Sequence, residues 1–199
     1  MPANTIDTAF ITLTLERFEG KGICRGYVPV DKDGNPLGES GVTIATGLDL
    51  GQQTQKELAA MGLPATIINR FIPYLGARKK EALYILARSP LVLTREEVDL
   101  VDAAVHAKYT GETADMFGRA AFTAAPREVQ AVAVSLHFQF GTPFRGSSPA
   151  LGKAWESMRR GEYRHAAAQL REPLGWSASH QRYMKRRQAE AVLLEKAAA

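Results

Sequence analysis

Apolar side chains recur at helical spacing near the N-terminus. Phe10 and Leu13 form one set with this spacing, and Ile11, Leu15 and Phe18 form a second set. Spacings of three, four and seven residues are typical of a helix that buries one face. The threonines and the isoleucine in this stretch are weak helix formers, so tertiary packing must hold the helix. The pattern predicts a helix over 7–18, ended by the glycines at 20 and 22.

The next segments have the character of strands. Ile23–Val30 and Gly41–Thr46 are short and rich in β-branched residues, and the segment 31–38 between them is dense in turn formers. Short β-branched runs that are separated by Gly, Pro, Asn and Asp predict strands joined by a turn. We expect two or three strands of a small sheet.

The rest of the sequence predicts helices that are separated by residues typical of helix starts and helix ends. Thr94 and Glu97 form a capping box, which opens a helix through about His106 or beyond. The other predicted helices run from Pro126 to Gly141, from Ser148-Pro149 to Gly161, from Gly161 to Arg171, and from about Ser179 to Glu195. The sequence therefore predicts an α+β fold, with a small β-lobe near the N-terminus and a larger helical lobe.

Composition narrows the class of protein. The chain has 199 residues, 45% of them hydrophobic and 23% charged, with a formal net charge of +4 and one cysteine. These values exclude a disordered chain and a disulfide scaffold. No apolar run reaches the length of a membrane span, and no basic residue precedes Arg17, so we expect synthesis in the cytoplasm without a signal peptide. The length favours one domain.

Motifs for metals and nucleotides are weak. The segment 31–35 (DKDGN) mimics the start of a calcium loop, but Pro36 and Val42 stand where the required glycine and glutamate would be. It is therefore interpreted as a turn. The four histidines lack metal-ligand spacing, and His137 is interpreted as a hydrogen-bonded core or boundary residue. Cys24 is interpreted as a packing residue. We expect no metal, no cofactor and no phosphate-binding loop.

Four basic residues in the last predicted helix allow three interpretations. They are Arg182, Lys185, Arg186 and Arg187. They could form a solvated face, a patch that binds a polyanion, or a face from which one arginine points inward to pair with a carboxylate. Aromatic residues are sparse around them, so nucleic acid is not the expected partner.

Three residues near the N-terminus could carry glycosidic chemistry. Glu19 follows the first predicted helix, and Thr43 and Asp49 lie six residues apart in the second β-like segment. Inverting hydrolysis needs one protonated carboxyl on the leaving oxygen and a base on the opposite face, with room for a water. A partly buried Glu19 would suit the acid, and the Thr43 and Asp49 side chains could hold the water. On spacing alone, Glu19 could equally be a surface residue and Thr43 a plain strand residue.

Four segments together resemble a known family. Phe18-Glu19-Gly20 and the segment 41–51 (GVTIATGLDLG) are similar to phage-type lysozymes, above all to their pesticin-like muramidase branch. The segments 126–132 (PREVQAV) and 185–190 (KRRQAE) support the resemblance. It implies a single lysozyme-like catalytic domain over 1–199, with a small lobe at about 20–60. The helical lobe would be 61–199, with the N-terminal helix 7–19 packed on it.

The resemblance also implies the roles of individual residues. Glu19 matches the general acid, Thr43 the residue that positions the attacking water, and Asp49 the acidic residue that follows it by six. The commoner phage pattern places the aspartate before the threonine, which leaves Asp33 as the alternative base. Arg186 is the expected partner of Glu19, and Arg187 is nearly equivalent.

The implied activity is that of a muramidase, a glycoside hydrolase. It would hydrolyse the β-1,4 bond between N-acetylmuramic acid and N-acetylglucosamine in peptidoglycan, with inversion, and lyse bacteria. We expect a monomer that acts on the cell wall in the periplasm, as a phage endolysin or as a bacteriolytic effector or bacteriocin domain. An effector would also have an immunity protein as partner. The alternative is a non-catalytic wall-binding protein on the same fold.

Overall fold

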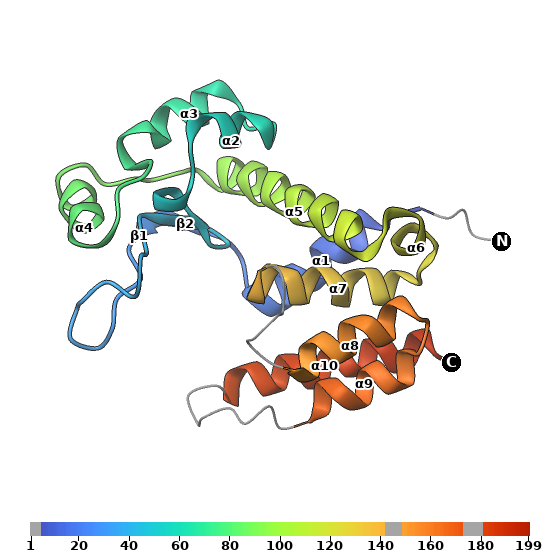
Figure 1. Ribbon diagram of the computed structural model, residues 1–199. Coiled ribbons are helices and arrows are strands. Elements are labelled where there is room, and N and C mark those ends of the chain that lie inside the picture. Colours follow the sequence, from blue (N-terminus) through green and yellow to red (C-terminus); the bar gives the residue numbers. More distant parts are fainter. Residues whose placement is uncertain (1–4, 142–148, 173–180) are drawn as a thin grey trace. The chain divides into compact units, whose positions relative to one another are not determined.

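The chain divides into two compact units in a computed structural model that describes residues 5–141, 149–172 and 181–199. We call Glu19–Lys108 the sheet unit, and Met1–Phe18 together with Tyr109–Ala199 the helical unit. Figure 1 shows strands in the first and helices in both. The fold is α+β and lysozyme-like, as the sequence predicts.

The elements follow one another along the chain in a simple order. The sheet unit contains β1 (Ile23–Tyr27), β2 (Thr43–Ala45), β3 (Leu48–Asp49), η1 (Leu50–Gln52), α2 (Gln55–Ala60), α3 (Ala65–Phe71), η2 (Ile72–Tyr74), α4 (Lys79–Arg88) and the start of α5 (Arg95–Phe117). The helical unit contains α1 (Thr8–Glu19) up to Phe18, the end of α5, α6 (Arg119–Ala124), α7 (Arg127–Phe140), α8 (Pro149–Arg159), α9 (Tyr163–Arg171) and α10 (Gln181–Ala197).

The sheet is antiparallel, in the order β1-β2-β3. Its first pair is irregular, because Ile23 lies opposite Ala45 whereas Tyr27 lies opposite Thr43. Five residues of β1 thus span three residues of β2, which is the mark of a β-bulge. The prediction of two or three strands is confirmed, although β1 ends at Tyr27 rather than at Val30.

The sheet unit runs beyond its strands as far as Lys108, and the predicted lobe limits at 20–60 and 61–199 stay a prediction. Backbone bonds from Gly26 N to Leu91 O (2.9 Å) and from Leu93 N to Cys24 O (2.8 Å) tie β1 to the segment before α5. A bond from Lys79 N to Ser40 O (2.8 Å) ties α4 to the loop before β2. The boundary therefore falls at Lys108, because segments far along the sequence complete the hydrogen bonds of the strands.

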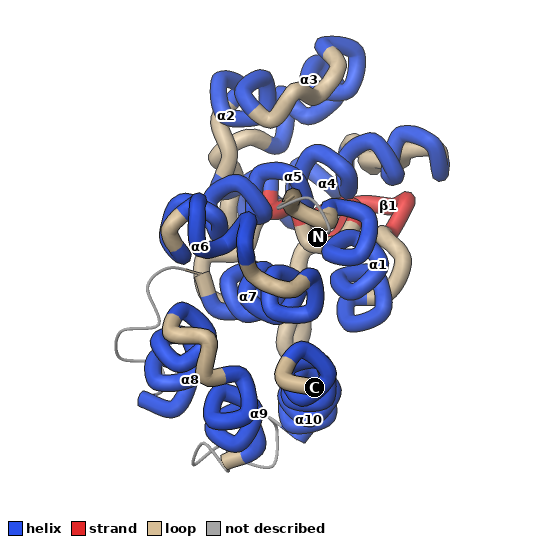
Figure 2. The backbone as a smooth tube through the Cα atoms, turned by 90° about the vertical axis from the view of Figure 1, so that its right-hand side faces the viewer, coloured by secondary structure: helices blue, strands red, loops and turns tan. Residues whose placement is uncertain are grey.

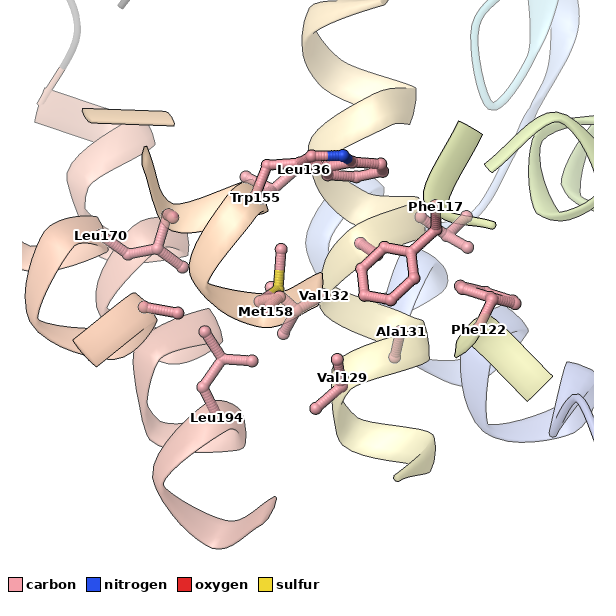
Figure 3. Packing of buried hydrophobic residues seen from close by; sticks show 14 of the residues in the cluster. Phe117, Phe122, Val129, Ala131, Val132, Leu136, Trp155, Met158, Leu170 and Leu194 are labelled. Carbon is pink, nitrogen blue, oxygen red and sulfur yellow. The ribbon is translucent and has the colours of Figure 1, made fainter. Parts of the chain in front are cut away.

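The helical unit is built around α7, whose middle is buried on all sides. Residues Val129 to His137 are all buried. Figure 3 shows side chains of α7 packed with Phe117, Trp155 and Met158. Ile11 and Leu15 of α1 are fully buried in the same cluster, whereas Leu13 is exposed. Of the two sets of apolar residues in the N-terminal pattern, the second, which contains Ile11 and Leu15, therefore faces the core.

Several helices begin and end at the capping residues that the sequence predicts. Thr94 and Glu97 form the capping box, with Thr94 N donating to Glu97 Oε2 (2.8 Å) and Glu97 N donating to Thr94 Oγ1 (3.2 Å). Pro126 is the N-cap of α7 rather than its first residue, and Gly141 (φ 68°) closes that helix. The predicted helix starts at Ser148 and near Ser179 lie outside the described residues.

The last three helices form a layer in which α9 contacts both α8 and α10 (Figure 2). The apolar face of α9 supplies Ala166, Ala167 and Leu170 to the core, and all three are fully buried. Among the described residues, no helix is both long and apolar enough to cross a membrane.

Candidate active site

Glu19 lies at the C-terminal end of α1, as the sequence predicts. The chain leaves the helix through Gly20, whose φ of 82° lies in the left-handed region that favours glycine. The Glu19 side chain is exposed, rather than partly buried as expected of a general acid. Its catalytic role stays a prediction.

A short connection ties Glu19 to the sheet. At Gly22 an added Cβ would collide with Val98 and with the side chain of Asp102, and it would touch Ala45. Only glycine lets the backbone approach these groups so closely. Three residues of chain span at most about 11 Å, so Glu19 is confined to the neighbourhood of the β2 end at which Ala45 lies.

Thr43 and Asp49 lie directly opposite each other on β2 and β3. The bond from Leu50 N to Val42 O (2.8 Å) flanks this pair, which makes it a non-hydrogen-bonded pair of the antiparallel ladder. Cα atoms in such pairs are about 4.5 Å apart, and the two side chains share one face of the sheet. Thr43 and Asp49 are six residues apart in the sequence because a tight hairpin joins the strands on which they face each other.

The Asp49 carboxylate is held by backbone amides. Its Oδ1 accepts hydrogen bonds from Gly51 N (2.9 Å) and Gly41 N (3.0 Å), and its Oδ2 lies 3.2 Å from Gly41 N. Asp49 is also the N-cap of η1. Two donors occupy Oδ1, and Oδ2 has only the longer contact, so Oδ2 is the atom with capacity to accept a proton or a water.

Two glycines allow this arrangement. A Cβ on Gly51 would lie 2.5 Å from Ala77 O and 2.8 Å from Gly41 Cα, and a Cβ on Gly41 would lie 2.5 Å from Gly51 Cα. Atoms cannot approach that closely, so both positions require glycine. Gly41 and Gly51 are the first and last residues of the 41–51 motif. Their backbones contact each other, and both of their amides donate to the Asp49 carboxylate, which explains why glycine stands at both positions.

Asp102 of α5 anchors the hairpin turn. Its Oδ1 accepts hydrogen bonds from Thr46 N (2.8 Å) and Thr46 Oγ1 (2.7 Å). The turn is tight, with Ala45 (φ 57°) and Gly47 (φ 112°) both in the left-handed region. Sequence reasoning missed Asp102, which lies 56 residues beyond its partner and inside an ordinary helical pattern.

Tyr27 is a second residue that sequence reasoning missed. It pairs with Thr43 across β1 and β2, so Tyr27, Thr43 and Asp49 form one row across the three strands. Burial of the phenol, and then the negative charge of Asp49, raise the pKa of Tyr27 above its ordinary value. The bulge in β1 sets this register, and no sequence pattern signalled it.

Asp33, the alternative base, lies in a self-contained turn. Asp31 Oδ1 accepts hydrogen bonds from Asp33 N (2.9 Å) and Asn35 N (2.8 Å), and these amides, that of Asn35 above all, lower the pKa of Asp31. The interpretation of segment 31–35 as a turn is confirmed. Asp33 is exposed and lies outside the strands that hold Thr43 and Asp49.

Two arginines of the C-terminal basic cluster point inward, as the third interpretation of that cluster proposed. Arg187 Nη2 donates to Glu190 Oε1 (2.6 Å), and Arg186 Nη2 donates to Ser135 Oγ (2.8 Å). Arg186 also lies over the ring of Phe18, 5.1 Å from its centroid. The carboxylate that pairs with both arginines is Glu190, on the same helix. The predicted pairing of Arg186 with Glu19 stays a prediction.

His137 and Cys24 have structural partners. His137 is buried, and its Nδ1 lies 2.9 Å from Thr113 Oγ1. Thr113 donates its own hydrogen to Tyr109 O (2.6 Å), so His137 Nδ1 is the donor of the first bond. Cys24 Sγ accepts a hydrogen bond from Arg95. In the described ranges, no three His, Cys, Asp or Glu side chains gather where a metal ion could be held.

The fold and this hairpin define a lysozyme-like protein of the phage type. A family model described as Pesticin, a bacterial toxin homologue of phage lysozyme (C-terminal part), matches residues 5–164. The match covers more than half of the chain, so the protein belongs to this family, and the predicted resemblance is confirmed. The match ends before α10 and does not include segment 185–190. No curated protein matched the sequence.

Proposed function

We propose that the protein is a peptidoglycan muramidase. It hydrolyses the β-1,4 bond between N-acetylmuramic acid and N-acetylglucosamine, with inversion, and so lyses bacterial cell walls. The observation that carries the proposal is the direct cross-strand pairing of Thr43 with Asp49, in a chain of the phage-lysozyme homologue family.

In this mechanism Glu19 protonates the oxygen of the leaving sugar. The Thr43 hydroxyl and Asp49 Oδ2 hold a water on the opposite face of the sugar ring, and Asp49 accepts its proton as the water attacks the anomeric carbon. The open side of Oδ2 supports this role, because the two amide donors gather on Oδ1. Arg186 supports Glu19 electrostatically, and its place over Phe18, the residue before Glu19, favours this assignment.

The site of action is the bacterial cell wall, reached in the periplasm after release or delivery. We propose a monomer that functions as an endolysin or as a bacteriolytic effector or bacteriocin domain, in the last cases with an immunity protein as partner. The competing function is non-catalytic wall binding on the same fold. Retention of Glu19, Thr43 and Asp49 together favours the enzyme.

A Glu19→Gln variant tests the proposal most directly, since it keeps the shape of the side chain and removes the acid. Wild type should clear a suspension of purified peptidoglycan or permeabilised Gram-negative cells and release new reducing ends. The variant should do neither while it stays folded. The anomeric configuration of the fresh product, followed by NMR, distinguishes inversion from retention.

Glu16→Gln is the matched control, because Glu16 is an exposed carboxylate on the same helix. It should clear the suspension at the wild-type rate. If wild type binds peptidoglycan without cleaving it, the competing function holds. Equal clearing by Glu19→Gln and wild type would show that another group is the acid.

A further inference from the structure

Tyr27 owes its position to the bulge in β1. With the register that pairs Ile23 with Ala45, the residue opposite Thr43 would be Arg25, whereas the bulge places Tyr27 there. Gly26 lies in this irregular stretch, and an added Cβ there would lie 3.1 Å from Leu91 Cβ and 3.2 Å from Val42 Cγ1, so these neighbours would have to shift. Bulges beside active sites commonly re-aim one side chain, and here the side chain is a phenol beside the proposed water site.

Tyr27 does not have the surroundings of a packing residue. Tyr74 shows what a structural tyrosine looks like in the same unit: it is 3% exposed, and its hydroxyl donates to Ser89 O (2.7 Å). Tyr27 is 39% exposed, and within the described part of the chain its hydroxyl makes no hydrogen bond. A half-buried phenol with a free donor is suited to bind something from solution.

The neighbours of Tyr27 define what it could bind. Thr43 lies between Tyr27 and Asp49, and it is 4% exposed. Across two strand spacings of about 4.8 Å each, a tyrosine can lean over the central residue toward the third strand. The row thus presents an aromatic face, a phenol donor and a carboxylate oxygen, which together suit a sugar ring with its hydroxyl and acetamido groups.

We infer that Tyr27 is a substrate-contacting residue that holds a peptidoglycan sugar against the Thr43–Asp49 pair. The inference rests on the proposed muramidase function. The ring packs on the apolar face of the sugar, and the hydroxyl donates a hydrogen bond to a sugar oxygen. Burial, and then the negative charge of Asp49, raise the pKa of Tyr27 above its ordinary value of 10.0, so this phenol is protonated, and therefore a donor, at neutral pH.

Binding without turnover tests the inference. The probe is soluble, uncross-linked glycan strands, titrated calorimetrically into the Glu19→Gln protein and into the same protein with Tyr27→Phe. Loss of one hydrogen bond should weaken binding about 2- to 12-fold. Tyr84→Phe is the matched control, because Tyr84 is an exposed phenol of the same unit that bonds to Arg88 on α4. It should bind like its parent.

A spectroscopic measurement separates contact from structure. With ¹³C-labelled tyrosine, the Cζ resonance of Tyr27 should shift when glycan strands are added, and that of Tyr84 should not. Unchanged affinity in Tyr27→Phe, an unmoved Tyr27 resonance, or failure of the parent to bind the strands would each overturn the inference. If the parent binds and Tyr27→Phe weakens binding, but wild type cleaves no peptidoglycan, the muramidase proposal fails and the Tyr27 contact stands.

Discussion

Arg187 donates a hydrogen bond of 2.6 Å to Glu190, and neither side chain has any exposed surface. Arg187 also donates to Gln139 Oε1 (2.7 Å) and lies over the ring of Phe140, so it fastens α10 to the end of α7. A buried charge of this kind is tolerable only with a partner, since desolvation costs several kcal/mol for each ion.

Replacing Arg187 with Met should therefore destabilise the protein by roughly 3–5 kcal/mol, because the Glu190 carboxylate would stay buried with one cation fewer. Chemical denaturation measures the loss. Arg171→Met is the control, since Arg171 pairs with Glu195 of the same helix at the surface, and solvent screens that pair. A loss no larger than that of the control would contradict the prediction.

Stability should also depend on pH through Glu190. Its burial raises its pKa above the ordinary 4.5, against the lowering effect of Arg187 and Arg186. The folded state thus holds this proton more tightly than the unfolded chain does. The resulting stability is fully present below the unfolded pKa and is lost as the pH rises through the folded pKa. The difference in unfolding free energy between wild type and Glu190→Gln should shrink as the pH rises from about 4.5 to neutral. If the difference in unfolding free energy between the two proteins stays constant across this pH range, the prediction is wrong.

Local signals allowed much of the fold to be predicted. The capping box at Thr94 and Glu97, the helix around Leu136 and the turn at Asp31 each depend on neighbours within a few residues. The Thr43–Asp49 pair was accessible for the same reason, because a tight hairpin turns a spacing of six into direct opposition. These features need no knowledge of distant contacts.

The parts that could not be predicted depend on distant segments. The register that brings Tyr27 opposite Thr43 follows from a bulge, and Asp102 meets Thr46 across 56 positions of sequence. The sheet unit runs to Lys108 for the same reason. Glu190, the carboxylate that pairs with Arg186 and Arg187, is only four and three residues away from them in the sequence. Charged pairs at these spacings in a polar helix usually face solvent, so their burial could not be predicted.

Gly51→Ala should destabilise the protein and abolish its activity. The added methyl group would overlap Ala77 O and the backbone of Gly41, so the loop that presents two amides to Asp49 would have to move. Denaturation and peptidoglycan clearing measure the two effects. Gly111→Ala is the control, because Gly111 lies within α5 with open space around it, and alanine there should stabilise the helix by up to about 1 kcal/mol. A stable, active Gly51→Ala protein would contradict the close contact.

Asp49→Asn separates the structural role of this residue from its proposed chemical role. Asparagine keeps one side-chain oxygen, which can accept the amides of Gly41 and Gly51 in place of Oδ1, and so the hairpin should remain folded. The base is lost, so clearing of peptidoglycan should fall at least about 100-fold. Asp33→Asn should leave the rate unchanged, since Asp33 lies in the 31–35 turn. Thermal denaturation of both variants checks the fold. If Asp33→Asn is the inactive variant and Asp49→Asn retains activity, the attacking water is activated from the turn, and Asp49 serves only to hold the two glycine amides.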